Sequence, residues 1–209
     1  MKSQFYYILF NKPYGVLSQF TPEAGHRSLK DYGPFPKGVY PVGRLDADSE
    51  GLLLLTNDNE TKHKLTTPTL RHERSYLVQV EGIPEEPALQ KLTRGVVIDG
   101  RATLPADVHL LKAEPPLPPR LVPIRFRKNI PTCWLELILT EGRNRQVRKM
   151  TAAVGHPTLR LVRTRISFLA LGGLHPGESR GLTANEVSQL KSIVQPADKT
   201  AKPRRSGLH

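Results

Sequence analysis

The chain has 209 residues and a marked excess of positive charge, with 31 Lys and Arg residues against 19 Asp and Glu residues and a formal net charge of +12. This length is enough to bury a substantial core, and the single cysteine, Cys133, excludes an intrachain disulfide and a thiolate zinc cluster. No apolar run reaches the roughly 20 residues that a transmembrane helix requires. The composition therefore predicts a reducing, cytoplasmic setting, with nucleic acid as the leading partner.

The positive charge has two other interpretations. A small protein can be merely basic, but here the arginines gather in clusters along the chain, which favours contacts with phosphates. A role at a membrane surface would need a long basic helix with an apolar face, and the sequence has none.

The first third of the chain predicts two strands, a long loop and a short helix. Residues 5–10 are aromatic and β-branched and precede a Pro/Gly turn, so they predict a strand. Residues 21–38 are rich in Pro, Gly and charge, which is typical of a surface loop. The apolar run 52–55 has no polar side and predicts a central strand that is buried on both faces. Polar side chains at residues 57–60 then favour a helix that ends before Pro68.

The middle of the chain predicts a strand, a helix, a hairpin and a proline-rich segment. Period-two alternation over residues 74–81 indicates a strand. Proline and two glutamates at residues 84–86 favour a helix that stops at Gly95. Residues 96–111 predict a hairpin that turns at an Asp-Gly pair. Residues 112–123 hold too many prolines for a helix or an interior strand, so they form either a stiff connector between two lobes or an extended loop.

The last third predicts two strands, two helices and a tail. Residues 134–139 favour a strand, and a helix is expected to begin near Asn144. Residues 158–171 alternate and predict a strand that a Gly-Gly pair ends. A capping box at residues 183–186 predicts the final helix. Residues 195–209 are basic and poor in apolar side chains, which predicts a disordered tail.

Charged residues crowd the loop in front of the apolar run. They are Arg44, Asp46, Asp48 and Glu50. Charges held against a rigid buried strand favour a functional site, although a loop of turn-forming residues that enters a strand explains the same pattern. Clustered carboxylates also suit a hard cation, so a metal-dependent phosphodiesterase that uses these carboxylates together with Asp58 is the lowest-ranked hypothesis.

A second cluster of charge lies at residues 141–150, in the sequence EGRNRQVRKM. In a helix formed by this segment, Arg148 lies at the border of an apolar stripe that consists of Val147, Met150 and Val154. A half-buried arginine in that place favours pairing with a carboxylate. The alternative is an exposed basic face that grips phosphates.

Several stretches together carry a specific resemblance. They are GRLD at residues 43–46, DSEGLLLLTND at 48–58, the strand with Tyr76, and EGRNRQVRKM at 141–150. They resemble the pseudouridine synthase family, in particular its ribosomal small-subunit synthase A branch, and the resemblance extends from residue 5 to about residue 190. It implies an α+β fold in which helices and loops flank a mixed, mainly antiparallel central sheet and two lobes enclose a catalytic cleft. On this basis residues 1–194 form the catalytic domain.

The chain departs from that branch in a few places. Members commonly carry an RNA-binding domain of the S4 type ahead of the catalytic domain, whereas this chain starts directly with the first predicted strand. In this respect it resembles the large-subunit members that lack the domain. Arg74 stands where a lysine is usual, and Lys149 where an arginine is usual. Neither change falls on an expected catalytic position.

The resemblance assigns roles to single residues. Asp46 is expected to be the nucleophile, and Arg148 the ion-pair partner that favours its ionised form. Tyr76, which pattern alone predicts to be a core aromatic, is expected beside the target uracil, and Arg44 in the stack that the flipped nucleotide leaves. The expected RNA-binding residues are Arg44, Arg143, Asn144, Arg145, Gln146, Lys149, Arg163 and Arg165. The resemblance implies no metal, nucleotide or organic cofactor.

The implied function is the site-specific isomerisation of uridine to pseudouridine in ribosomal RNA, with the target base flipped out of its stack. The expected substrate is 23S rather than 16S ribosomal RNA, and the expected protein is a monomer with no membrane partner. Asp46 could attack ribose C1′, attack uracil C6 or remove the C2′ proton, and the sequence leaves these routes open. The alternative function is a non-catalytic RNA-binding factor in ribosome assembly.

Overall fold

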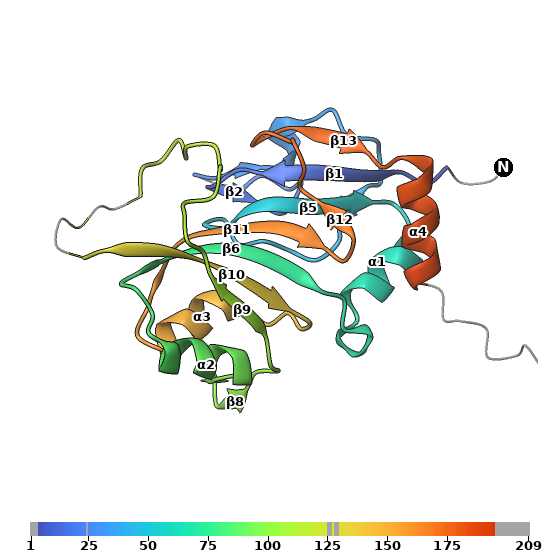
Figure 1. The fold of residues 1–209 in the computed structure, drawn as a ribbon. Coiled ribbons are helices and arrows are strands. Elements are labelled where there is room, and N and C mark those ends of the chain that lie inside the picture. The colour runs from blue at the N-terminus through green and yellow to red at the C-terminus, as the bar shows by residue number, and fades with distance from the viewer. Residues whose placement is uncertain (1–3, 24, 125–126, 128–129, 195–209) are drawn as a thin grey trace, which may run out of the picture.

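The computed structural model describes residues 4–23, 25–124, 127 and 130–194, and it is built on one large sheet (Figure 1). In the order in which they lie side by side, the strands of this sheet are β13 (Ser179–Gly181), β1 (Tyr7–Lys12), β5 (Glu50–Thr56), β11 (Thr158–Ile166), β6 (Arg74–Glu81), β10 (Thr132–Leu139) and β9 (Asp107–Leu110). In addition, β4 (Tyr40–Pro41) pairs with β5, and β12 (Leu169–Ala170) pairs with β11. Among the described strands of this sheet, β5 and β11 run parallel and the other pairs are antiparallel. The predicted α+β fold with a mixed, mainly antiparallel sheet is confirmed.

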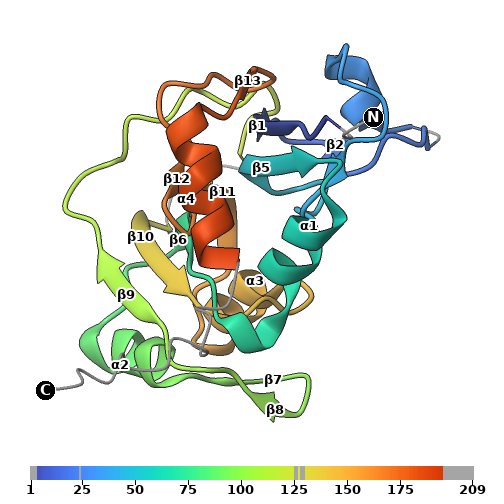
Figure 2. The same ribbon diagram turned by 90° about the vertical axis from the view of Figure 1, so that its right-hand side faces the viewer.

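The helices lie in two groups, with α2 and α3 below one end of the sheet and α1 and α4 beside the other (Figures 1 and 2). Their bounds are α1 (Asn59–Thr66), α2 (Glu86–Arg94), α3 (Gln146–Ala153) and α4 (Ala184–Val194), and short 3₁₀ helices span Leu29–Tyr32 and Pro68–Leu70. Two small ribbons pair β2 (Val16–Leu17) with β3 (Arg27–Ser28) and β7 (Val97–Ile98) with β8 (Arg101–Ala102). No helix in the described part of the chain is long and apolar enough to cross a membrane.

The strand β5 lies inside the sheet and is buried along its whole length. Leu52 and Leu54 pack into one apolar cluster, whereas Leu53 and Leu55 pack into another that contains Phe10. Because fully burying one leucine side chain contributes roughly 1.5–3 kcal/mol, this strand is a rigid support for the loop before it. The prediction of a central strand that is buried on both faces is confirmed.

Two apolar clusters form the cores of two lobes. The β6 cluster joins β6, β10, α2 and α3 and includes Val78, Leu92, Leu135 and Met150. The β5 cluster joins β1, β5, α1 and α4 and includes Leu9, Leu54, Leu65 and Leu190. The strand β11 connects them, since Leu161 belongs to the β6 cluster and Ile166 to the β5 cluster.

The predicted hairpin over residues 96–111 is wrong in its pairing. Only the short strands β7 and β8 pair across the Asp-Gly turn, while β9 pairs with β10 in the large sheet. Pro105 lies between β8 and β9 and offers no N–H to a ladder, so it separates the two pairings.

The predicted strand over residues 158–171 is a hairpin. The chain leaves β11 after Ile166, and Ser167 adopts a left-handed conformation with φ of 52°. Ile166 then pairs with Leu169 of β12. The alternating pattern of apolar and polar residues continues through the turn, so the pattern did not reveal that the chain reverses direction there.

The proline-rich segment has no helix or strand over residues 112–123 and joins β9 to β10, which pair with each other. It is therefore the extended loop of the two predicted alternatives and not a connector between lobes. Its Pro118 carbonyl accepts a hydrogen bond from Arg160 at 2.9 Å, and the Arg120 guanidinium lies over the Tyr14 ring at 4.0 Å. The predicted tail at residues 195–209 lies outside the described residues.

Candidate active site

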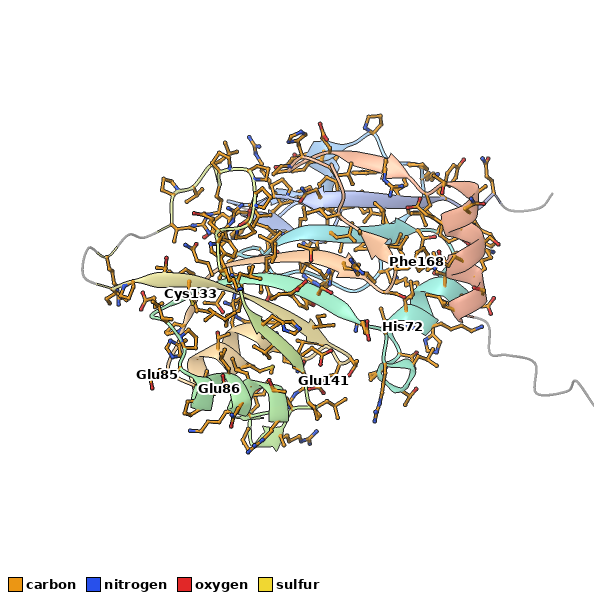
Figure 3. All side chains as sticks on the ribbon, viewed as in Figure 1. His72, Glu85, Glu86, Cys133, Glu141 and Phe168 are labelled. Carbon is orange, nitrogen blue, oxygen red and sulfur yellow. The ribbon has the colours of Figure 1, made fainter. Side chains whose placement is uncertain are left out.

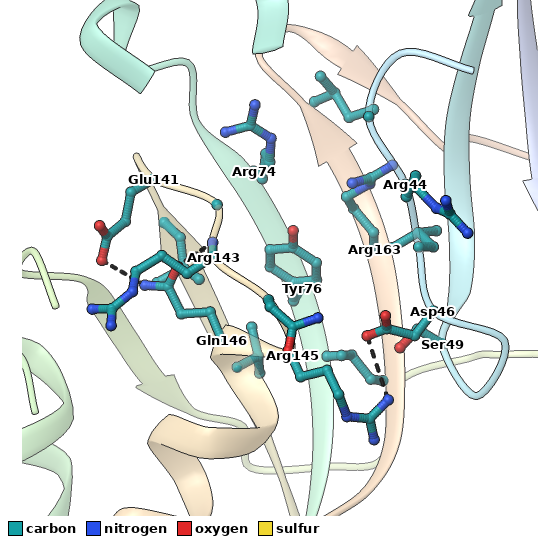
Figure 4. Close-up of a pocket in the computed structure, with 18 of the residues that line it drawn as sticks. Arg44, Asp46, Ser49, Arg74, Tyr76, Glu141, Arg143, Arg145, Gln146 and Arg163 are labelled. Carbon is teal, nitrogen blue, oxygen red and sulfur yellow. Dashed lines mark hydrogen bonds and ion pairs between the residues drawn. The ribbon is translucent and has the colours of Figure 1, made fainter. Parts of the chain in front are cut away.

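A cavity of about 560 Å³ lies between the two lobes. Its apolar walls come from both clusters, with Leu45 and Val147 on one side and Leu65 and Ile166 on the other. Its polar walls come from the loop before β5, the loop before α3, and the strands β6 and β11 (Figure 4). The two charged stretches that lie about a hundred residues apart in the sequence therefore meet at one site.

Asp46 lies on a loop whose backbone is held at each step. Residues 45–48 are here called the Asp46 loop. Their four successive backbone carbonyl groups all accept hydrogen bonds. In chain order the donors are Ser18 Oγ at 2.7 Å, Ser49 N at 3.0 Å, Gly15 N at 2.7 Å and Arg148 Nη2 at 2.6 Å. A carboxylate on such a loop is presented in a fixed position, which is what a catalytic group requires.

A buried lysine, Lys12, lies behind this loop. Its side chain is fully buried, and Nζ donates to the carbonyl oxygens of Pro13 at 2.9 Å and Val16 at 2.7 Å and reaches Ala47 at 3.5 Å. Burial lowers the pKa of Lys12 to about 7, although the nearby carboxylate of Glu50 raises it. The Lys12 Nζ group thus links the turn after β1 to the Asp46 loop.

The ion pair of Asp46 is made by Arg145, with Nη1 3.6 Å from Oδ2. The same guanidinium donates to both carboxylate oxygens of Asp48, at 3.1 and 2.7 Å. The side chains of Asp46 and Arg145 are 38% and 41% exposed, so this pair lies at the open side of the cavity. An exposed pair of this kind contributes about 0–1 kcal/mol to stability.

Arg148 does not make the predicted ion pair with Asp46. Its Nη2 donates to the backbone carbonyl of Asp48 at 2.6 Å, its Nη1 donates to that of Thr158 at 3.3 Å, and its Nε lies 3.4 Å from Asp48 Oδ2. Arg148 borders the buried stripe of α3 and is only 13% exposed, so it reaches the loop from inside the protein. Arg145 precedes that helix and reaches Asp46 from the solvent side.

Asp48 lies between these two guanidinium groups. Burial raises the pKa of Asp48, but the hydrogen bond from Arg145 and the charges of Arg148 and Arg145 outweigh burial and lower it below the ordinary value of 3.8. Asp48 is therefore an ionised link between α3 and the Asp46 loop.

Tyr76 lies on β6 and is 9% exposed. It packs in the β6 cluster with Val78, and its ring also forms part of the cavity wall, across from Asp46 (Figure 4). Tyr76 is thus both the core aromatic that the pattern predicts and a residue of the site.

Other residues that were expected to bind RNA also line the cavity. They are Arg44, Arg143, Asn144, Arg145, Gln146 and Arg163. Two others are not among the cavity residues. Lys149 pairs with Asp99 at 2.6 Å, and Arg165 is exposed on β11.

Gln146 is buried, and its side chain forms hydrogen bonds with the loop before α3. Its Nε2 donates to Glu141 Oε1 at 2.6 Å, and its Oε1 accepts from the Arg143 backbone N–H at 2.9 Å. The Arg143 guanidinium donates to the Ile98 carbonyl at 2.7 Å and thereby holds the β7–β8 ribbon. Both polar atoms of the Gln146 amide thus have partners inside the protein, and RNA binding by this residue stays a prediction.

The sequence interpretation missed Arg74 as a cavity residue. Its Nη2 donates to the Leu65 carbonyl at 2.9 Å and its Nη1 to that of His72 at 3.0 Å. Burial lowers the pKa of Arg74 from its ordinary value. The signal was present, since period two places residue 74 on the same face of the strand as Tyr76.

The acidic residues of the phosphodiesterase hypothesis do not converge. Glu50 and Arg160 form a buried bidentate pair with both N···O distances at 2.9 Å. Asp58 caps α1 and accepts hydrogen bonds from Tyr7 and Thr61. Across the described ranges no group of three potential metal-binding side chains is present, and this hypothesis is contradicted.

The site can place a carboxylate against a planar polar ring. Asp46 faces a cavity that has an aromatic ring on one wall and guanidinium groups around it (Figure 4). Stacking holds such a ring by its face, while the cations attract the phosphates of a nucleic acid. A carboxylate in this position acts as a nucleophile or a base.

Known proteins are similar to this chain in sequence and in fold. A sequence profile described as RNA pseudouridylate synthase matches residues 6–153. A protein of Vibrio parahaemolyticus named ribosomal large subunit pseudouridine synthase E is 53% identical over 171 residues, which cover 82% of this chain and 71% of that protein. A protein of the same name from Xanthomonas campestris is 52% identical over 175 residues, which cover 83% of this chain and 93% of that protein. A crystal structure of a pseudouridylate synthase superposes with a TM-score of 0.75 at 28% identity, over 90% of this chain and 74% of that one. The chain belongs to the RNA pseudouridylate synthase family.

Proposed function

We propose that this protein isomerises uridine to pseudouridine in the RNA of the large ribosomal subunit. The observation that carries the proposal is the position of Asp46, on a loop held by four carbonyl hydrogen bonds and across the cavity from Tyr76. Relatives named ribosomal large subunit pseudouridine synthase E support the choice of substrate.

The cavity suits a single flipped nucleotide. Its volume of about 560 Å³ lies in the range of roughly 300–1,000 Å³ that is usual for small-ligand sites. A base inside a stacked helix is inaccessible to Asp46, so the enzyme must extrude it at a cost of about a few kcal/mol. Exposed Arg44 beside the cavity is placed to enter the emptied stack, and the net charge of +12 offsets the cost through phosphate contacts.

The reaction needs no external group. The N1–C1′ bond breaks, the uracil rotates, C5 bonds to C1′, the C5 proton leaves and N1 gains a proton. Asp46 assists the first bond cleavage by one of the three routes named above, and Tyr76 keeps the detached ring in the cavity by stacking. Arg148 and Asp48 act indirectly, because their contacts hold the Asp46 loop in position.

Three finer statements belong to the same proposal. The substrate is 23S ribosomal RNA, the protein works as a monomer, and it works in the cytoplasm. The names of the relatives support the first statement. The third follows from the first, since ribosomal RNA is made and assembled there in bacteria, to which these relatives belong.

Release of tritium from ribosomal RNA that contains 5-tritiated uridine tests the proposal, because the C5 proton leaves only when the new bond forms. The wild-type protein releases tritium and Asp46→Asn does not, since an amide is no nucleophile, while RNA binding by this variant persists. The matched control is Glu114→Gln, which neutralises an exposed carboxylate on the proline-rich loop and leaves the rate unchanged. Release by Asp46→Asn at the wild-type rate would refute the assigned nucleophile.

A further inference from the structure

Arg163 lies at the centre of the site. On β11 it is paired in register with Tyr76 of β6 on one side and with Gly51 of β5 on the other. It is 3% exposed and lines the cavity, and Figure 4 shows it between the strand of Tyr76 and the Asp46 loop. Arg163, which was expected to bind RNA, is therefore a buried cation inside the site.

The guanidinium of Arg163 is only partly satisfied. Its Nε donates to the Leu52 carbonyl at 2.8 Å, which fixes the orientation of the planar group. Its Nη2 is buried and has no hydrogen-bond partner among the described residues. Arg163 is also in none of the ion pairs found in the described part of the chain.

Its neighbours behave differently. Arg160, on the same strand, fills its donors with both carboxylate oxygens of Glu50 and with the Pro118 carbonyl. Arg74, across the cavity wall, donates to two backbone carbonyls. A buried charged donor without an acceptor is costly, so the arrangement at Arg163 is explained if an acceptor arrives with the substrate.

On the proposed function that acceptor is the uracil. Exposed Arg44 and Arg145 lie at the open side of the cavity, where phosphates of the RNA backbone pass. Arg163 lies deeper, next to Tyr76, where the flipped ring stacks. The ring offers its carbonyl oxygens O2 and O4 as acceptors.

Resting on the proposed function, we propose that Arg163 is a catalytic residue that binds a carbonyl oxygen of the flipped uracil and stabilises its negative charge when the glycosidic bond breaks. The bonding pair of N1–C1′ stays with the uracil and spreads over N1, O2 and O4. A fixed guanidinium beside O2 or O4 stabilises this negative charge in the transition state and so lowers the barrier to cleavage of the N1–C1′ bond. The charge disappears when C5 bonds to C1′, C5 loses its proton and N1 gains one.

The test compares single-turnover tritium release at saturating RNA for the wild-type protein and Arg163→Met. Removing one donor to a developing anion lowers the rate by roughly 100-fold to 1,000-fold, while RNA affinity stays close to that of the wild type. The charge-matched control is Arg94→Met, at the exposed end of α2, which keeps the wild-type rate. A wild-type rate for Arg163→Met, or a loss of RNA affinity that accounts for the whole effect, overturns the proposal.

A second measurement begins with the wild-type protein alone. Ribosomal RNA transcribed with 2-thiouridine or 4-thiouridine carries a weaker acceptor at O2 or O4, and one of the two slows the wild-type protein. The same substitution leaves the residual rate of Arg163→Met unchanged, because the contact is already lost. A wild-type rate that is indifferent to both thio substitutions overturns the role of Arg163. Failure of the wild-type protein to release tritium from unmodified RNA contradicts the proposed function itself, so the two failures are distinguishable.

Discussion

At the scale of single residues, the site separates two arginines that look alike in the sequence. Arg145 meets Asp46 at the open side of the cavity, where both side chains are about 40% exposed. Arg148 is only 13% exposed, and its Nη2 donates to the Asp48 carbonyl at 2.6 Å. Arg145 therefore interacts with the charge of the Asp46 carboxylate, whereas Arg148 holds the backbone that positions it.

This difference predicts losses of stability of different size in two matched variants. Arg145→Met removes two partly exposed ion pairs, with Asp46 and with Asp48, and lowers the free energy of unfolding by about 1 kcal/mol. Arg148→Met removes a hydrogen bond from a charged group to the part-buried Asp48 carbonyl, which costs about 1.5–3 kcal/mol. Urea unfolding of both variants measures the two values. Equal losses of stability would contradict the supporting role of Arg148.

The resemblance placed Asp46 and Tyr76 at one site, and both line the cavity, but the ion pair of Asp46 is made by Arg145 and not by Arg148 as predicted. Both arginines lie on one short segment, and the contact depends on where α3 begins. Arg145 has a left-handed φ of 51° immediately before that helix. No residue type in the segment requires that conformation, so the spacing could not reveal it.

At the scale of elements, the contact between β5 and β11 holds the site together. Gly51 has a φ of 104°, and a Cβ atom there would lie 2.3 Å from the Arg163 carbonyl oxygen. Only glycine allows β5 to approach β11 this closely, since both the backbone conformation and the space exclude a side chain.

Gly51→Ala is expected to destabilise the protein by more than about 2 kcal/mol, because a strained conformation alone costs roughly 1–3 kcal/mol and the clash adds to it. Gly100→Ala is the control, since Gly100 also has a positive φ, of 73°, but its Cβ would meet nothing within 4 Å. It should lose only about 1 kcal/mol. Thermal unfolding compares the two variants. Similar melting temperatures would contradict the claim that Gly51 is required for the close approach of β5 to β11.

The helix α1 after β5 depends on Asp58. Its carboxylate accepts hydrogen bonds from the Tyr7 hydroxyl at 2.5 Å, the Thr61 hydroxyl at 2.7 Å and the Thr61 N–H at 3.2 Å. Burial raises the pKa of Asp58, but the hydrogen bonds from Tyr7 and Thr61 outweigh burial and lower it below the ordinary value of 3.8. A carboxylate with a lowered pKa contributes stability that is present above the unfolded pKa and lost as the pH falls through the folded pKa.

Asp58→Asn is therefore less stable than the wild type at pH 7, and the difference shrinks as the pH falls below about 3.8. The asparagine keeps one capping oxygen, but an amide NH2 replaces the second carboxylate oxygen, which accepts from the Tyr7 and Thr61 hydroxyls. Losing a hydrogen bond to a charged acceptor costs about 1.5–3 kcal/mol at neutral pH. Urea unfolding of both proteins between pH 7 and pH 3 measures the difference. A gap that stays constant over this range would mean that the charge of Asp58 contributes nothing.

The elements themselves were largely predictable. The run 52–55 and the alternation over residues 74–81 locate β5 and β6, because burial on two faces and on one face leave different patterns. The errors came at residues 96–111 and 158–171, where the pairing depends on contacts that are distant in the sequence. Local periodicity shows that a segment is extended, but it does not show which strand it joins.

At the scale of the whole molecule, two lobes meet along β11 and leave a cavity that neither lobe could form alone. The resemblance predicted this arrangement as a fold, whereas composition and spacing predicted only a basic protein with a core. The unpaired donor of Arg163 lay beyond sequence reasoning, because it depends on the partners that surround one buried atom.

The central claim is that Asp46 in this cavity modifies ribosomal RNA of the large subunit. Mapping pseudouridines in the ribosomal RNA of cells that lack the protein tests it most directly. The account predicts the loss of pseudouridine from the large-subunit RNA, its return when the wild-type protein is supplied, and no return with Asp46→Asn produced at the same level. An unchanged pseudouridine map in the deleted strain, or restoration by Asp46→Asn, would contradict the account.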